Sequence, residues 1–169
     1  MKRWMTGVNL LAFFAGVIML AAMLIPWWSF QLEFSEQTDL YPYLLDGPGS
    51  EFVGYKRSPQ MSILTGVLVV AIGLCFLGSF NTGRGSRIIL FISGILIFLG
   101  AWRLLLRITD VAARFDLPIQ GHTRGNYGGF AEVYVSTWRR PGLYLIGVAG
   151  LLVLVAGLFQ RKLWLQFKD

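Results

Sequence analysis

The sequence has little of the chemistry that most catalytic and cofactor sites need. Its 169 residues include one cysteine, Cys75, and one histidine, His122. A disulfide or a thiol-redox role needs a second cysteine, and a bis-histidine haem site needs a second histidine. His122 has no neighbouring nucleophile motif, and no GxxxxGK phosphate loop occurs. The acidic residues at 33–39 are more typical of a solvated loop than of a metal site. We therefore expect no enzyme activity, no cofactor and no bound metal.

Charge is also scarce, at 14% of residues, while 55% are apolar. Soluble domains have about 25% charged and about 45–50% apolar residues. Disorder, which requires low hydrophobicity, is excluded. The composition predicts an all-α integral membrane protein. Its net charge of +6 comes from basic residues beside apolar runs, where they contact lipid headgroups, so we expect no nucleic-acid partner.

Four apolar segments are long enough to cross a bilayer, whose hydrocarbon core of about 30 Å needs about 20 helical residues. We expect one membrane domain over 1–169, with spans at 5–26, 61–80, 88–106 and 142–159. The expected connections are an outer loop at 27–60, an inner turn at 81–87, an outer loop at 117–140 and a tail at 160–169. The third helix should continue to about residue 116, because no Gly or Pro interrupts it there. Cleavage of the first 25 residues as a signal peptide is the alternative, but their apolar run exceeds an h-region.

The distribution of charge predicts the orientation. The face that contains both termini has seven basic residues and one acidic residue, whereas the other face has eight of each and is much longer. Basic residues concentrate on the cytoplasmic side of membrane proteins. Both termini should therefore lie in the cytoplasm, and we expect the membrane to be the plasma membrane.

Tryptophan gives a second criterion for the span ends. Trp favours the membrane–water interface, where its ring is apolar and its N–H stays hydrated. We expect all six to be interface anchors, because each lies at or near a predicted span end: Trp4, Trp27, Trp28, Trp102, Trp138 and Trp164.

Small residues recur at a seven-residue spacing within the predicted spans. The pairs are Ala15/Ala22, Gly66/Gly73, Ser93/Gly100, Ala149/Ala156 and Gly150/Gly157. Two turns separate the members of a pair, so each pair marks one helix face where backbones can approach closely. This spacing favours a left-handed four-helix transmembrane bundle.

The outer loops contain strand patterns. Apolar and polar residues alternate from Trp28 to Ser35, and a similar pattern runs from Phe130 to Trp138. A third candidate is Phe52 to Tyr55, and the Gly-rich run 121–129 suggests a flexible lip. We expect a small extracytoplasmic antiparallel sheet formed by the two outer loops.

The predicted extension of the third helix bears a ladder of charge. Arg103, Arg107, Asp110 and Arg114 are spaced 4, 3 and 4 residues apart, so they share one helix face. The ladder has a structural interpretation, pairing with Glu33, Glu36 or outer-leaflet phosphates. The functional interpretation is an anion site for a lipid headgroup, an acidic partner, or a carboxylate or phosphate.

This layout resembles the claudin and peripheral-myelin-protein class of tetraspan membrane proteins. The matching features are cytoplasmic termini, Pro26-Trp27-Trp28 leading into an outer strand, a long first loop, an extended third helix and a second-loop strand. The Gly-Leu-Trp motif and the first-loop cysteine pair of claudins are absent, so the disulfide and pore-lining residues cannot be transferred. The resemblance implies a sheet-topped four-helix bundle that works by contact with other proteins.

The favoured function is a non-catalytic accessory or structural subunit that docks to a larger membrane assembly through its helices and outer sheet. One alternative is a self-associating claudin-like contact or channel protein. Another is a lipid- or quinone-binding protein that uses Arg103, Arg107 and Arg114. The expected partners are therefore membrane lipids and either other membrane subunits or further copies of the chain.

Overall fold

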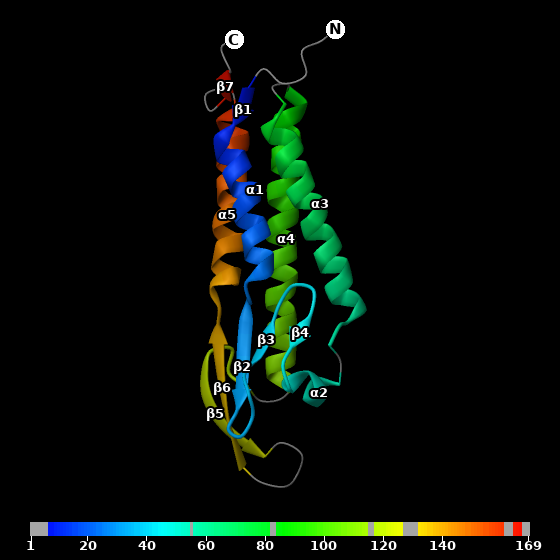
Figure 1. Ribbon diagram of the computed structural model, residues 1–169, viewed down its shortest axis with the longest axis vertical. Coiled ribbons are helices and arrows are strands. Elements are labelled where there is room, and N and C mark those ends of the chain that lie inside the picture. The colour runs from blue at the N-terminus through cyan, green and yellow to red at the C-terminus, as the bar shows by residue number, and fades with distance from the viewer. Residues whose placement is uncertain are drawn as a thin grey trace.

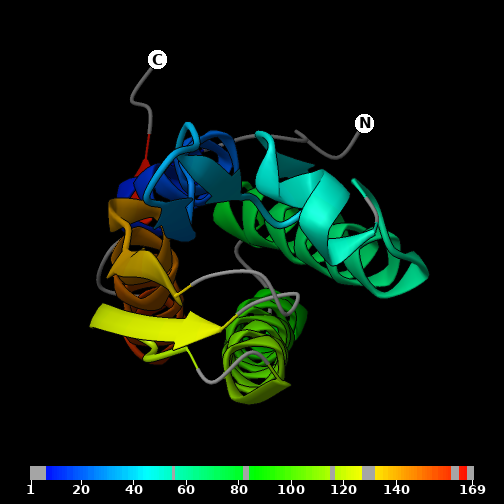
Figure 2. The same ribbon diagram turned by 90° about the horizontal axis from the view of Figure 1, so that it is seen from below.

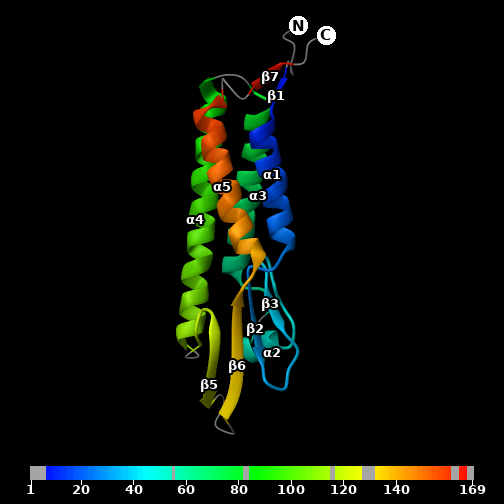
Figure 3. The same ribbon diagram turned by 90° about the vertical axis from the view of Figure 1, so that its left-hand side faces the viewer.

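The molecule is elongated, with long helices in one part and a β-sheet in the other (Figure 1). The computed structural model describes residues 7–54, 56–81, 84–114, 117–126, 132–160 and 164–166. Its long helices are α1 (Leu10–Leu24), α3 (Pro59–Ser79), α4 (Arg84–Arg114) and α5 (Pro141–Leu158). These four lie side by side, and α1 and α4 each contact both α3 and α5 (Figure 2, Figure 3).

Three helices in the described residues are long and apolar enough to cross a membrane. They are α3, the Gly85–Ala113 part of α4, and α5. α1 has 15 residues, or about 22 Å at 1.5 Å per residue, which is less than the hydrocarbon core of about 30 Å. The helices are compatible with an integral membrane protein, and the fourth span of the predicted bundle stays a prediction.

The start and end of α1 have local causes. The side-chain Oδ1 of Asn9 accepts a hydrogen bond from the Ala12 backbone N–H at 3.2 Å and caps the helix. The preceding strand, β1 (Gly7–Asn9), pairs antiparallel with β7 (Trp164–Gln166). Ile25 is extended, as expected for a residue before proline. The helical part of the predicted 5–26 span is therefore shorter than the span itself.

Small residues lie in the helix contacts, with one exception among the predicted pairs. Gly66 and Gly73 have open space where a Cβ would lie, so the prediction that they pack is wrong. α3 instead turns Ala71 and Gly78 toward α4, and these have the same seven-residue spacing. The Ser93 hydroxyl donates to the Ala71 carbonyl oxygen at 2.7 Å, and both residues are buried. The members of the other pairs are buried.

The five-stranded antiparallel sheet confirms the small sheet predicted from the two connections at 27–60 and 117–140, and its extracytoplasmic position stays a prediction. Its order is β4-β3-β2-β6-β5. The strands are β2 (Trp28–Leu32), β3 (Thr38–Leu40), β4 (Leu45–Asp46), β5 (Gly121–Asn126) and β6 (Glu132–Arg139). The β2–β6 pair joins the two loops, with Trp28 opposite Arg139. In Figure 1 the sheet lies at the end of the molecule opposite β1 and β7.

Three local predictions differ from the structure. The candidate strand at Phe52–Tyr55 is wrong where the structure describes it, because Phe52 and Val53 belong to the short helix α2 (Gly49–Val53) and Gly54 is its C-cap, with a φ of +84° that suits glycine. Tyr55 lies outside the described residues. The lip expected at 121–129 is strand β5 over its first six residues, where β6 supplies backbone partners, and 127–129 lie outside the described residues. The inner turn at 81–87 is shorter than expected, because α4 begins at Arg84.

Candidate functional site

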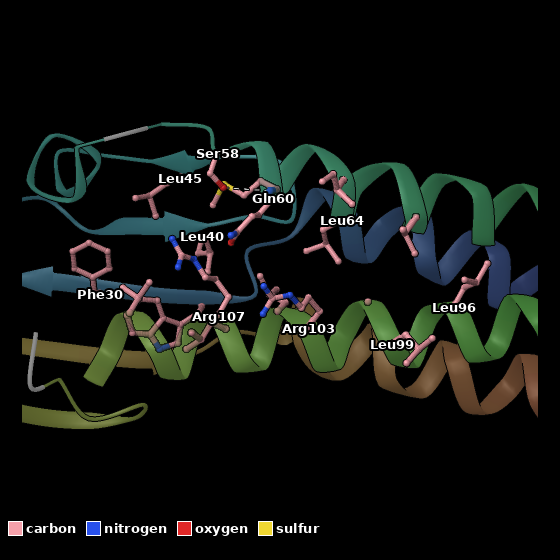
Figure 4. Close-up of a pocket in the computed structure, with 18 residues that line it drawn as sticks. Phe30, Leu40, Leu45, Ser58, Gln60, Leu64, Leu96, Leu99, Arg103 and Arg107 are labelled. Carbon is pink, nitrogen blue, oxygen red and sulfur yellow. Dashed lines mark hydrogen bonds between the residues drawn. The ribbon is translucent and has the colours of Figure 1, made fainter. Parts of the chain in front are cut away.

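An apolar cavity of about 360 Å³ lies between α3 and α4, next to strands β2, β3 and β4 (Figure 4). Buried side chains form its inner wall, among them Phe30, Leu64 and Leu104, which are at most 7% exposed. Its rim includes Ile63 and Leu99, which are 68% and 58% exposed. The cavity therefore opens between the two helices, on the face where apolar side chains are exposed.

The sheet closes one end of this cavity. Trp28 and Phe30 alternate with Ser29 and Gln31 along β2 and are buried against the cavity, together with Leu40 of β3. The Trp28 indole N–H donates to the Ile119 carbonyl oxygen at 2.9 Å, which satisfies its polar atom inside the protein. The alternation read from the sequence thus faces the apolar side of β2 toward the helices.

The start of α3 forms the wall that faces α4, beside the strands (Figure 4). Ser58 caps the helix by accepting a hydrogen bond from the Met61 backbone N–H at 3.3 Å, and Pro59 occupies the first helical turn. Ser58 and Gln60 line the cavity beside the apolar Met61 and Leu64. The helix N-terminus therefore supplies both polar and apolar lining groups.

Arg103 and Arg107 of α4 are the only charged residues among the described residues that line the cavity. Their i,i+4 spacing places them on one face of the helix. Arg103 is exposed and Arg107 is half-buried. In Figure 4 both side chains reach from α4 toward α3 and the strands, between Phe30 and Leu45 on one side and Leu96 and Leu99 on the other.

The structure divides the predicted charge ladder. Arg103 and Arg107 line the cavity, whereas Asp110 is exposed and is not a lining residue. The side chain of Arg114 lies outside the described residues. Glu33, one proposed partner of the ladder, instead accepts a hydrogen bond from the Tyr134 backbone N–H at 3.1 Å. The two arginines that were predicted as an anion site are therefore brought together at an apolar pocket.

The predicted tryptophan anchors lie in different environments. Trp27 and Trp28 are 0% and 2% exposed, and the Trp27 indole donates to the Ala22 carbonyl oxygen at 2.7 Å. Their rings are packed inside the protein and do not face an interface. Trp102 is 62% exposed on α4 and Trp138 is half-buried. Trp4 and the side chain of Trp164 lie outside the described residues.

A second polar cluster lies on the β5–β6 hairpin. The His122 ring stacks on Tyr134 with centroids 5.4 Å apart, and the guanidinium of Arg124 lies 6.0 Å from the Tyr134 ring centroid. His122 Nδ1 is 2.8 Å from Ser136 Oγ, because the two residues are directly opposite in the strand register. We call His122, Arg124, Tyr134 and Ser136 the hairpin cluster.

Sequence reasoning identified the two arginines but missed the cavity and the hairpin cluster. Leu40 and Leu45 belong to strands of three and two residues, too short for a periodic signal. Val67 and Leu96 look like any other apolar residues of a span. The alternation of β2 was the available signal, because it required an apolar surface for Trp28 and Phe30 to face.

Comparison of this sequence with models of known protein families and with curated proteins gives no match. The claudin-like resemblance therefore stays a prediction, and the geometry of the chain carries the functional argument.

Proposed function

We propose that the protein is a non-catalytic integral membrane protein that holds the apolar chain of an amphiphile in the cavity between α3 and α4. The observation that carries this proposal is the cavity itself. It is lined mainly by apolar side chains, with a few polar groups at Ser58, Gln60, Arg103 and Arg107. Small-molecule sites typically have this composition and volumes of about 300–1,000 Å³.

The position of the cavity fits a ligand that comes from the bilayer. Ile63 and Leu99 on its rim are exposed apolar residues of helices that are long enough to span a membrane. A lipid chain beside α3 and α4 can therefore enter laterally without crossing water. Water would gain few hydrogen bonds from such walls, so an apolar chain is the favoured occupant.

Photo-labelling in vesicles tests this proposal. The protein is reconstituted in phosphatidylcholine that contains a photoactivatable acyl chain, irradiated and mapped by mass spectrometry. Leu64 and Leu104, 7% and 2% exposed, should be labelled because a chain reaches them through the cavity. Labelling only of residues outside the cavity that are exposed, such as Val70 and Leu77, would overturn the proposal.

A matched pair of variants on α3 provides the control. Val67 lines the cavity, and Val67→Phe should fill part of it and suppress labelling of Leu64 and Leu104. Val70 is 55% exposed and is not a lining residue, so Val70→Phe adds the same ring without entering the cavity. Equal labelling of the two variants would contradict chain binding at this site.

A second proposal, that the protein is an accessory subunit of a larger membrane assembly, is supported by the hairpin cluster. His122 and Arg124 are exposed and lie beside Tyr134, on a hairpin that projects beyond the helices. Tyrosine and arginine are enriched at protein–protein interfaces. The hairpin therefore presents side chains of the kind that anchor a partner above the membrane.

Site-specific cross-linking tests the docking proposal. A photo-reactive residue at position 124 should give adducts with another membrane protein in native membranes. Tyr134→Ser should reduce these adducts, whereas Tyr144→Ser, which removes a 57% exposed tyrosine from α5, should not. Adducts between copies of this chain would favour the claudin-like alternative, and absence of adducts would overturn docking through the hairpin.

A further inference from the structure

We propose that the amphiphile in the cavity is anionic, with a carboxylate or phosphate headgroup bound by Arg103 and Arg107. This inference rests on the function proposed above and adds the chemical class of the ligand. Chain binding requires only the apolar walls, whereas headgroup recognition requires the two guanidinium groups. The two steps can therefore fail separately.

The charge of the lining favours an anion. Arg103 and Arg107 contribute two positive charges, and no acidic residue is among the described residues that line the cavity. Each guanidinium has five N–H donors in a planar arrangement that matches a carboxylate or a phosphate.

The position of the arginines along α4 gives the headgroup a suitable depth. Arg103 is about 27 Å and Arg107 about 33 Å along the helix from Gly85, where the candidate span begins. The hydrocarbon core is about 30 Å thick. With Gly85 near one face of the membrane, the two guanidinium groups lie at the headgroup level of the other face.

The apolar part of the cavity continues from the arginines toward the membrane centre. Leu96 lies two turns before Arg103 on α4, about 10 Å deeper, and faces the cavity with Leu99 and Gly100. An amphiphile with its headgroup at Arg103 and Arg107 therefore places its chain beside Leu96 in the orientation of a bilayer lipid. Gln60, which lines the cavity from α3, adds an amide near the headgroup end (Figure 4).

Competition between three probes with the same sixteen-carbon chain tests the headgroup. Palmitate, hexadecyl phosphate and hexadecanol each compete with the photoactivatable phosphatidylcholine for labelling of Leu64. We expect both anions to compete at concentrations at least about tenfold lower than the alcohol, the ratio expected for one charge-assisted hydrogen bond. A difference between palmitate and hexadecyl phosphate would show whether a fatty acid or a phosphate-bearing lipid is the better ligand.

Variants assign this preference to the two arginines. Arg103→Gln combined with Arg107→Gln should remove the preference for anions and leave competition by hexadecanol unchanged. Arg57→Gln removes an exposed charge that is not in the cavity lining and should keep the preference. The double Arg→Lys variant retains both positive charges and should keep part of the preference for anions. It therefore distinguishes an effect of lost charge from an effect of altered folding.

Each alternative result has a distinct meaning. Equal competition by the alcohol and the anions in the unmodified protein overturns the headgroup proposal and leaves chain binding intact. Persistence of the anion preference in the double Gln variant also overturns it. Failure of the photoactivatable phosphatidylcholine to label Leu64 in the absence of competitors overturns the proposed function itself.

Discussion

The side-chain amides of Asn9 and Gln160 are hydrogen-bonded to each other, although 151 positions separate them in the sequence. Both side chains are buried, with exposed fractions of 0% and 1%. Gln160 Nε2 also donates to the backbone carbonyl oxygens of Asn81 at 3.0 Å and Gly78 at 3.2 Å. This pair therefore links the start of α1, the end of α5 and the connection between α3 and α4, at the end of the molecule away from the cavity.

Replacing Gln160 by leucine should destabilise the helix packing. The Asn9 amide and the carbonyl oxygens of Gly78 and Asn81 would lose a buried partner, which costs about 1–3 kcal/mol of unfolding free energy. Unfolding by sodium dodecyl sulfate in mixed micelles, followed by circular dichroism, measures the change. Phe159→Leu alters a neighbouring side chain that is 48% exposed and should change stability by less than about 0.5 kcal/mol. Equal effects of the two changes would contradict a structural role for the pair.

Two glycines of α3 should respond in opposite ways to alanine. A Cβ at Gly78 would lie 2.7 Å from Leu90 Cδ2 and Cγ, so Gly78→Ala should cost about 1–3 kcal/mol through overpacking against α4. Gly73 has nothing within 4 Å, so Gly73→Ala should be neutral or should stabilise the helix by up to about 1 kcal/mol. The same unfolding assay compares them, and a larger loss for Gly73→Ala would place the α3–α4 contact on the other face of α3.

Much of the helical architecture was readable from the sequence because it depends on local chemistry. The apolar runs at 61–80, 88–106 and 142–159 overlap α3, α4 and α5. Alternation at Trp28 and Phe30 correctly indicated a strand, because the side chains of a half-buried strand alternate between its two faces. The seven-residue pairs indicated packed faces in three helices but failed on α3, since spacing alone cannot tell Gly66 and Gly73 from Ala71 and Gly78.

The candidate site was less predictable because long-range pairing creates it. The shared face of Arg103 and Arg107 follows from helical periodicity, but their cavity depends on Leu40 and Leu45, which short strands bring to α3 and α4. The burial of Trp27 had no sequence signal either. Its indole N–H donates to the Ala22 carbonyl oxygen near the end of α1. Judged from the span boundary alone, Trp27 occupies a position typical of a membrane-interface anchor.

The two classes of tryptophan should be distinguishable in vesicles. Trp27 is buried and hydrogen-bonded, so Trp27→Phe should lower the unfolding free energy by about 1–3 kcal/mol. Trp102 is 62% exposed, so Trp102→Phe should change it by less than about 0.5 kcal/mol and should reduce the fluorescence that brominated lipids quench. Trp27→Phe should lower the total fluorescence but leave the amount that brominated lipids quench unchanged. A loss of quenching in Trp27→Phe would place this ring in contact with lipid.

Both ends of the chain should be accessible from the same side of the membrane. The strands β1 and β7 are paired, with Val8 opposite Leu165. The segment that precedes α1 and the segment that follows α5 therefore lie together. Three crossings by α3, α4 and α5 alone would separate them, so we predict a fourth crossing by the segment that contains α1. The excess of basic residues on this face predicts that it is cytoplasmic.

Cysteines introduced near each terminus in a Cys75→Ser background should react with an impermeant maleimide only after the membrane is opened, whereas a cysteine replacing the exposed Arg124 should react in intact cells. Reaction of the two termini from opposite sides would rule out the fourth crossing and would be incompatible with the β1–β7 pair.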